Sequence, residues 1–209
     1  MSDRFRRAAP VAAVLALLAA VSAGAWVVWG DGSDPALASN VTLPDPTPRL
    51  PYQEIKDVVV EPPGDVVFER KGQLAGYNAN GLLTEAELKI VEEQGGARIS
   101  STVTRDGGTT LGIWRFTVKD GVAPGGLFAE MDGLYKRGGH KDVQVQHQDV
   151  SLRLATSPEG ISVYHGHYVH GQDVFRIEGY GKDAAAVTKA VTELLDRQVK
   201  RTPAQRPAA

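Results

Sequence analysis

The chain has 209 residues, with 23 basic and 25 acidic side chains and a formal net charge of −2. Sequence-independent binding of nucleic acid needs a strongly basic surface, so this balance argues against a nucleic-acid partner. The chain contains no cysteine, which excludes disulfides, thiolate nucleophiles and thiolate-bound metal centres. Its length fits one globular domain with additional segments.

The N-terminal segment has the pattern of a membrane anchor. Three arginines within residues 1–7 precede residues 8–30, which carry no charged side chain. A helix that rises about 1.5 Å per residue over this length spans a hydrocarbon core of about 30 Å. The positive-inside rule places residues 1–7 in the cytoplasm and the rest of the chain outside. The side chains expected to anchor this helix in the bilayer are those of Val11, Leu15, Leu18, Trp26 and Trp29.

A cleaved secretory signal is the alternative interpretation of the same segment. The small residues Ala23, Gly24 and Ala25 match what a signal peptidase requires, so the protein would then be secreted after cleavage near Ala25. A buried helix in a cytosolic protein is disfavoured, because long uncharged runs behind arginines are unusual there. Both favoured interpretations place the body of the chain outside the cytoplasm.

Residues 31–51 have a different composition and predict a stalk. Five prolines lie in this stretch, and prolines at alternate positions prevent helix and sheet formation and favour an extended segment. Residues 52–202 are then expected to form the folded extracytoplasmic domain. The short polar segment 203–209 is predicted to be a disordered tail.

Short strands and helices alternate along the predicted domain. A hairpin is expected from 58–60 and 66–68, around Pro-Pro-Gly. Thr84 and Glu87 form a capping-box pattern that begins a helix ending near residue 95, and Asp183 caps the last helix. The remaining expected strands are 98–104, 109–118, 143–146, 150–156, 161–169 and 174–180. A second helix is expected after Pro124 and ends at Gly138-Gly139, and the last runs from about 184 to 200. This order predicts an α+β fold with a mostly antiparallel sheet and about three soluble helices.

A histidine cluster in the 161–169 strand and the turn after it is the pattern with the most chemistry. His165, His167 and His170 form H-x-H-x2-H, and neutral imidazoles are common ligands of zinc, nickel and copper. On a regular strand His165 and His167 share one face, and His170 projects to the other. The competing interpretation is a hairpin whose histidines are hydrogen-bonded or half-exposed, and this interpretation is favoured. A metal ion is therefore the one cofactor left open, and a pH-responsive role is a third hypothesis.

The next strand carries a second candidate site. Arg176, Glu178 and Tyr180 alternate with Phe175 and Ile177. The three polar side chains are candidates for ligand binding, although the same alternation marks the outward side of a half-covered sheet.

No sequence motif of a known catalytic site is present. The chain lacks a nucleophile elbow, an SxxK motif, a P-loop and a dinucleotide-binding glycine motif. We therefore predict no catalytic residue and a non-enzymatic protein in the cell membrane that binds an envelope protein, a wall polymer or a small ligand. The alternative function is a metal- or ligand-binding domain, conceivably hydrolytic, that uses His165, His167 and His170.

A resemblance supports the predicted location. The string YVHGQDVFRIEGYG is followed by a helix rich in alanine, valine and leucine, and an Arg/Ala-rich membrane segment and proline-rich stalk precede the domain. This layout resembles small anchored or secreted proteins of actinobacteria whose function is uncharacterised. The resemblance implies a bacterial cell-envelope location and implies no catalytic residue.

Overall fold

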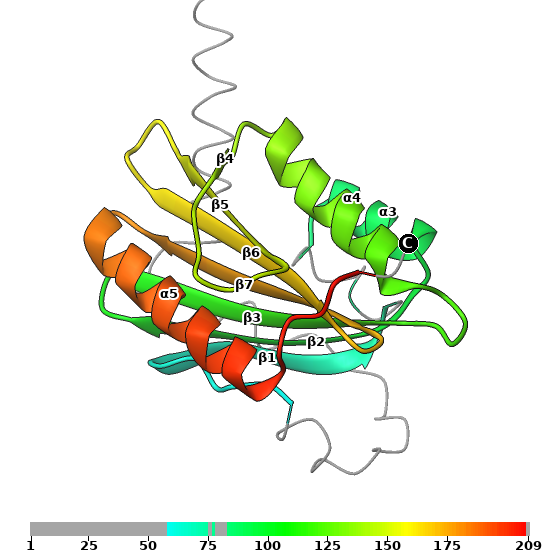
Figure 1. The fold of residues 1–209 in the computed structure, drawn as a ribbon. Coiled ribbons are helices and arrows are strands. Elements are labelled where there is room, and N and C mark those ends of the chain that lie inside the picture. The colour runs from blue at the N-terminus through cyan, green and yellow to red at the C-terminus, as the bar shows by residue number, and fades with distance from the viewer. Residues whose placement is uncertain (1–57, 75–76, 78–82, 208–209) are drawn as a thin grey trace, which may run out of the picture. The chain divides into compact units, whose positions relative to one another are not determined.

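The structure, a computed structural model, describes residues 58–74, 77 and 83–207, all within the compact unit 51–209. It confirms the predicted α+β class (Figure 1). The helices are α3 (Glu85–Glu93), α4 (Pro124–Arg137) and α5 (Ala184–Arg201). The strands are β1 (Asp65–Gln73), β2 (Gly96–Asp106), β3 (Thr109–Val118), β4 (Lys141–Asp142), β5 (Val150–Thr156), β6 (Ser162–His170) and β7 (Asp173–Gly181).

All seven strands belong to one antiparallel sheet, in the order β1-β2-β3-β7-β6-β5-β4. Tight hairpins join β2 to β3 and β6 to β7. Each contains a glycine with positive φ, Gly107 at 54° and Gly171 at 58°, a conformation that favours glycine. Because β7 pairs with both β3 and β6, it lies at the centre of the sheet, and its side chains are covered on both faces.

The two faces of the sheet are packed against different helices. Side chains two residues apart share a face of a strand. On one face Ile113 of β3 and Ile177 of β7 pack in a core with residues of α5. On the other face Trp114 and Phe116 belong to a second core, which includes residues of α3 and α4. Figure 1 shows α5 apart from the α3 and α4 pair, with the sheet between them.

The predicted helix starts are confirmed in atomic detail. Thr84 and Glu87 form the reciprocal capping box, with Thr84 N–H donating to Glu87 Oε2 at 2.6 Å. The carboxylate of Asp183 accepts hydrogen bonds from the backbone N–H groups of Ala185 and Ala186, each at 3.0 Å, and so begins α5.

Three local predictions differ from the structure. Residues 58–60 are not a strand, because Gln198 of α5 satisfies their backbone by accepting from Val60 N–H and donating to the Val58 carbonyl. Residues 143–146 are not a strand either, and β4 is limited to two residues. Residues 203–207 do not form a disordered tail, since Gln205 N–H donates to the Val169 carbonyl at 2.8 Å.

The predicted anchor and stalk lie outside the residues that the structure describes. This applies to segments 1–7, 8–30 and 31–51, including Val11, Leu15, Leu18, Trp26 and Trp29. Among the helices of the described part of the chain, none is long and apolar enough to cross a bilayer.

Candidate functional site

The polar residues predicted on two strands meet on one face of the sheet. In the β6–β7 pairing His165 lies opposite Glu178 and His167 lies opposite Arg176, so these four side chains project to the same side. The helices α3 and α4 cover that side. We call the following residues the α4 polar cluster: Glu87, Asp132, Tyr135, Arg153, His165, His167, Arg176, Glu178 and Tyr180.

Arg176 is the buried centre of this cluster. Its Nη1 donates to Glu87 Oε1 at 2.7 Å, and its Nη2 lies 3.0 Å from Glu178 Oε2. Its guanidinium carbon also lies 4.4 Å from the ring centroid of Trp114, in a cation–π contact. Burial opposes the charge of Arg176, but Tyr135, Glu178 and Glu87 raise its pKa, so the side chain stays charged. Two carboxylates and an aromatic face therefore compensate the buried cation.

Glu87 links the helix α3 to the rest of the cluster. Besides capping α3, its carboxylate accepts hydrogen bonds from Arg176 and from the hydroxyl of Tyr135 on α4. Burial opposes its ionisation, yet Arg176, together with the bonds from Tyr135 and Thr84, lowers the pKa of Glu87. One ionised carboxylate thus joins α3, α4 and β7.

The Glu178 side chain has room beside Arg176 because the residue paired with it on β3 is a glycine. Gly112 of β3 pairs with Glu178, and a Cβ at this glycine would lie 2.5 Å from Glu178 Oε1. The missing side chain therefore leaves the space that the Glu178 carboxylate occupies beside Arg176.

His165 is buried in a stack of rings. The Tyr135 ring lies parallel to it with centroids 3.8 Å apart. Its Nε2 is 3.1 Å from the Tyr180 hydroxyl, and its Nδ1 is 3.3 Å from His140 Nε2. Burial, followed by the nearby charge of Arg176, holds the pKa of His165 well below its ordinary value. His165 is therefore neutral at physiological pH.

His167 is fully buried and neither of its ring nitrogens has a hydrogen-bond partner. The closest carboxylate oxygen, Asp132 Oδ1, is 3.9 Å from its Nδ1. Burial and the charge of Arg176 lower the pKa of His167 to about 3. An unpaired imidazole in a closed core costs stability.

A second ion pair lies where α4 crosses β5. Arg153 donates to Asp132 from Nε at 2.6 Å and from Nη2 at 2.5 Å, and its Nη1 donates to Asp142 at 2.7 Å. Burial alone would raise the pKa of Asp132, but the bonds from Arg153 and Ser151 lower it. This bidentate ion pair holds α4 against β5.

The structure brings together two of the three histidines proposed as metal ligands. His165 and His167 share a face as predicted, whereas His170 is half-exposed and its Nδ1 is 2.9 Å from the Pro203 carbonyl oxygen. His147 is hydrogen-bonded to Asp196 of α5 at 2.7 Å. Over residues 58–74, 77 and 83–207, no group of three or more histidine, aspartate or glutamate side chains is arranged to hold a metal ion.

The ligand-binding candidates are less exposed than either sequence interpretation assumed. Arg176 and Glu178 are buried, and Tyr180 is partly buried. The sequence analysis did not assign Glu87, Asp132, Tyr135 or Arg153 to this cluster. Of these four residues, Arg153 lies in a strand, where its alternation with Leu152 and Leu154 is a local signal for its face.

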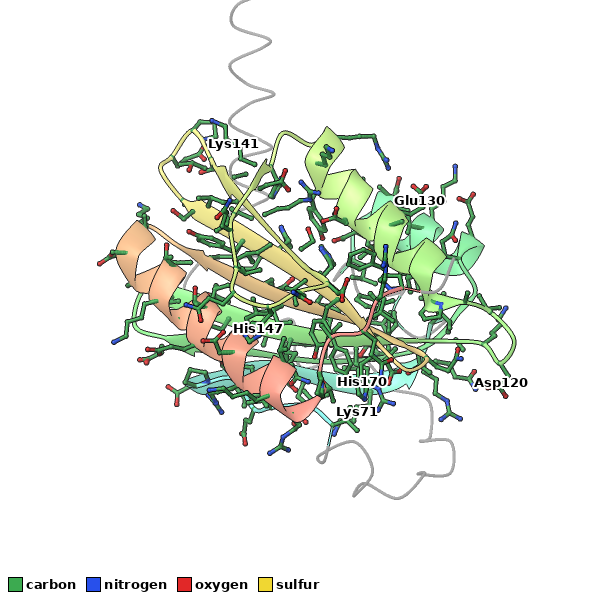
Figure 2. All side chains as sticks on the ribbon, viewed as in Figure 1. Lys71, Asp120, Glu130, Lys141, His147 and His170 are labelled. Carbon is green, nitrogen blue, oxygen red and sulfur yellow. The ribbon has the colours of Figure 1, made fainter. Side chains whose placement is uncertain are left out.

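The opposite face of the sheet has an open region beside β1. Here segment 59–61, strands β1 and β2 and the last turns of α5 enclose a groove of about 350 Å³. We call it the β1 groove. Figure 2 labels Lys71 near the C-terminal end of α5. The charged and hydroxyl-bearing residues that line the β1 groove include Glu61, Glu69, Lys71, Thr102, Arg197 and Arg201.

Comparison with known proteins gives no assignment for this fold or these sites. No protein-family model matches the chain, and no curated protein and no solved structure is detectably similar to it.

Proposed function

We propose that the chain is a non-enzymatic, single-pass membrane protein whose folded domain lies outside the cytoplasm and binds a protein, wall polymer or small ligand through the β1 groove. One observation carries the proposal. The charged side chains of the α4 polar cluster are paired with one another and its two histidines are buried beneath α3 and α4, whereas the β1 groove presents charged and hydroxyl groups to solvent.

The chemistry of the cluster fits a structural role better than catalysis. A general acid or base must reach a substrate and must have a pKa near the working pH. His165 and His167 are buried with lowered pKa values, and Glu87 is held ionised by Arg176. These groups neither face an open cavity nor titrate near neutrality.

The β1 groove has the features expected of a recognition site. It is concave, and it combines apolar side chains such as Val66 with hydroxyl and charged groups. Three basic side chains, those of Lys71, Arg197 and Arg201, line it together with two carboxylates, those of Glu61 and Glu69. Binding of a partially anionic ligand is consistent with this balance.

The proposed location is supported by the charge pattern of residues 1–30 and is tested by cysteine labelling. Because the chain has no cysteine, a single introduced thiol reports its own accessibility. A membrane-impermeant maleimide is expected to label Lys182→Cys on intact cells. The same reagent is expected to label Ser2→Cys only after the cells are permeabilised. Protection of Lys182→Cys until the cells are lysed would contradict the proposal. The intact mass of the mature protein separates an anchored chain from one cleaved near Ala25.

A further inference from the structure

We propose that the β1 groove takes an extended peptide segment of a partner protein, which adds as a strand to the outer edge of β1 and places an acidic side chain beside Arg197. This inference rests on the proposed binding function and specifies the partner.

Among the described residues, β1 is the longer of the two edge strands of the sheet. β1 has nine residues and lies at the end of the strand order, and no strand of the described residues pairs with its outer side. The opposite edge ends in β4, which has two residues. An edge strand presents unpaired N–H and C=O groups, and an added strand satisfies them.

Exposed apolar side chains mark this edge as unusual. Val66 and Val67 are 50% and 51% exposed, and they are the large hydrophobic side chains that stand exposed in the described part of the chain. A bulge between Val66 and Phe68 disturbs one end of β1, while residues 68–73 pair regularly with β2. Most of the edge is therefore regular enough to accept a strand.

The groove borders β1 on the face of the sheet that α5 packs against, next to the place that an added strand would take. Glu69 and Lys71 lie two residues apart on β1, so they share one face of the strand, and both line the groove. Side chains of a neighbouring strand follow the same two-residue period, so every second residue of an added peptide would face the groove. Backbone pairing would supply affinity, and the groove would select among side chains.

Charge favours an acidic residue at that position. Lys71 Nζ is 3.5 Å from Glu69 Oε1, so these two charges largely offset each other. Arg197 Nη2 instead donates to the backbone carbonyl of Glu61 at 3.1 Å, a neutral acceptor that does not offset its charge. Arg201, one turn further along α5, lines the same groove. The alternative is that these arginines serve only the dipole of the α5 C-terminus, in which case reversing one charge would not alter peptide binding.

The test uses the full chain in a non-ionic detergent and a labelled, capped nine-residue peptide in which valine alternates with threonine and glutamate. Fluorescence polarisation is expected to show saturable binding. Arg197→Glu is expected to weaken it about tenfold, the factor for about 1.4 kcal/mol. Lys189→Glu, which reverses another exposed cation of α5 outside the groove, is expected to bind like the parent.

N-methylated peptides test strand addition itself. Two versions carry methyl groups on alternate backbone nitrogens, in opposite phases. In a peptide strand that pairs along one edge, every second backbone N–H points toward the partner strand. Methylation of those nitrogens is expected to abolish binding, whereas methylation of the other nitrogens is expected to leave binding intact. Equal binding of both versions, or no saturation at about 1 mM peptide, would overturn the inference.

Other occupants have their own signatures. Displacement of the peptide by inorganic polyphosphate at equal affinity would show an anion site without strand pairing, and a concentration-dependent dimer abolished by Arg197→Glu would show a second copy of the chain. Either result overturns the inference. Lys182→Cys labelling of intact cells is independent of these outcomes, so failure of the peptide test is distinguishable from failure of the proposed location.

Discussion

Lowering the pH from 7 to 5 is expected to destabilise the folded domain through its buried histidines. The ordinary pKa of histidine is about 6.5, whereas that of His167 is lowered to about 3 and that of His165 lies well below its ordinary value. Below pH 6.5 the unfolded chain therefore binds protons that the folded chain excludes. The stability contributed by the neutral rings is complete above that pH and is lost as the pH falls.

The size of the effect follows from proton linkage. Each proton taken up by the unfolded chain alone costs about 1.4 kcal/mol of unfolding free energy per pH unit, so His167 costs about 2 kcal/mol between pH 6.5 and 5. His165 acts in the same direction, because burial also holds its pKa well below the ordinary value. The lowered pKa values of Glu87 and Asp132 act in the same direction but at lower pH, because ordinary carboxyl groups titrate near pH 4.

Urea unfolding of the full chain in detergent, followed by far-UV circular dichroism at pH 7 and pH 5, measures this loss. His167→Leu is expected to reduce this loss by about 2 kcal/mol, the share of His167. The variant should lose little stability at pH 7, because the replaced ring makes no hydrogen bond. His170→Gln, on the same strand with a half-exposed ring, is the matched control and should behave like the parent. Equal stability of the parent at both pH values, or an undiminished loss in His167→Leu, would refute the reasoning.

Two further predictions concern the packing of the cluster, and a third concerns metal binding. Arg176→Met leaves Glu87 and Glu178 buried without their cation, and urea unfolding should show a loss of about 3–5 kcal/mol; an unchanged midpoint would show that the ion pairs are dispensable. Gly112→Ala forces the Glu178 carboxylate to move and should cost about 1–3 kcal/mol in the same assay, whereas Gly108→Ala, with nothing within 4 Å of the added carbon, should not. Because the structure does not gather the three histidines of the motif, EDTA should leave the unfolding midpoint unchanged; a fall reversed by zinc would favour a metal site.

The sequence predicts which side chains share a face better than it predicts what covers that face. Strand alternation correctly placed His165 with His167, and Arg176 with Glu178 and Tyr180, because the two-residue period is local. The capping residues of α3 and α5 were likewise predictable, since each cap bonds within three residues. These signals need no knowledge of the tertiary fold.

The site itself depends on contacts between distant residues. Glu87 looks like a helix cap in the sequence, and its second role depends on Arg176, which lies 89 residues further along the chain. The β1 groove depends on where α5 docks and on β1 pairing with β2 instead of with residues 58–60. No pattern within one element encodes these placements, so they emerge only when the sheet is assembled.

Chemical modification of the histidines tests most directly whether the α4 polar cluster is closed and structural. Diethylpyrocarbonate reacts with accessible neutral imidazoles, and mass spectrometry locates the modified residues. In the folded full chain His170 and His147, both partly exposed, should be modified while His165 and His167, which are 6% and 0% exposed, stay unmodified until urea unfolds the protein. Rapid modification of His165 or His167 in the folded chain would show that the cluster opens to solvent, and would contradict its assignment as a sealed support for a binding domain.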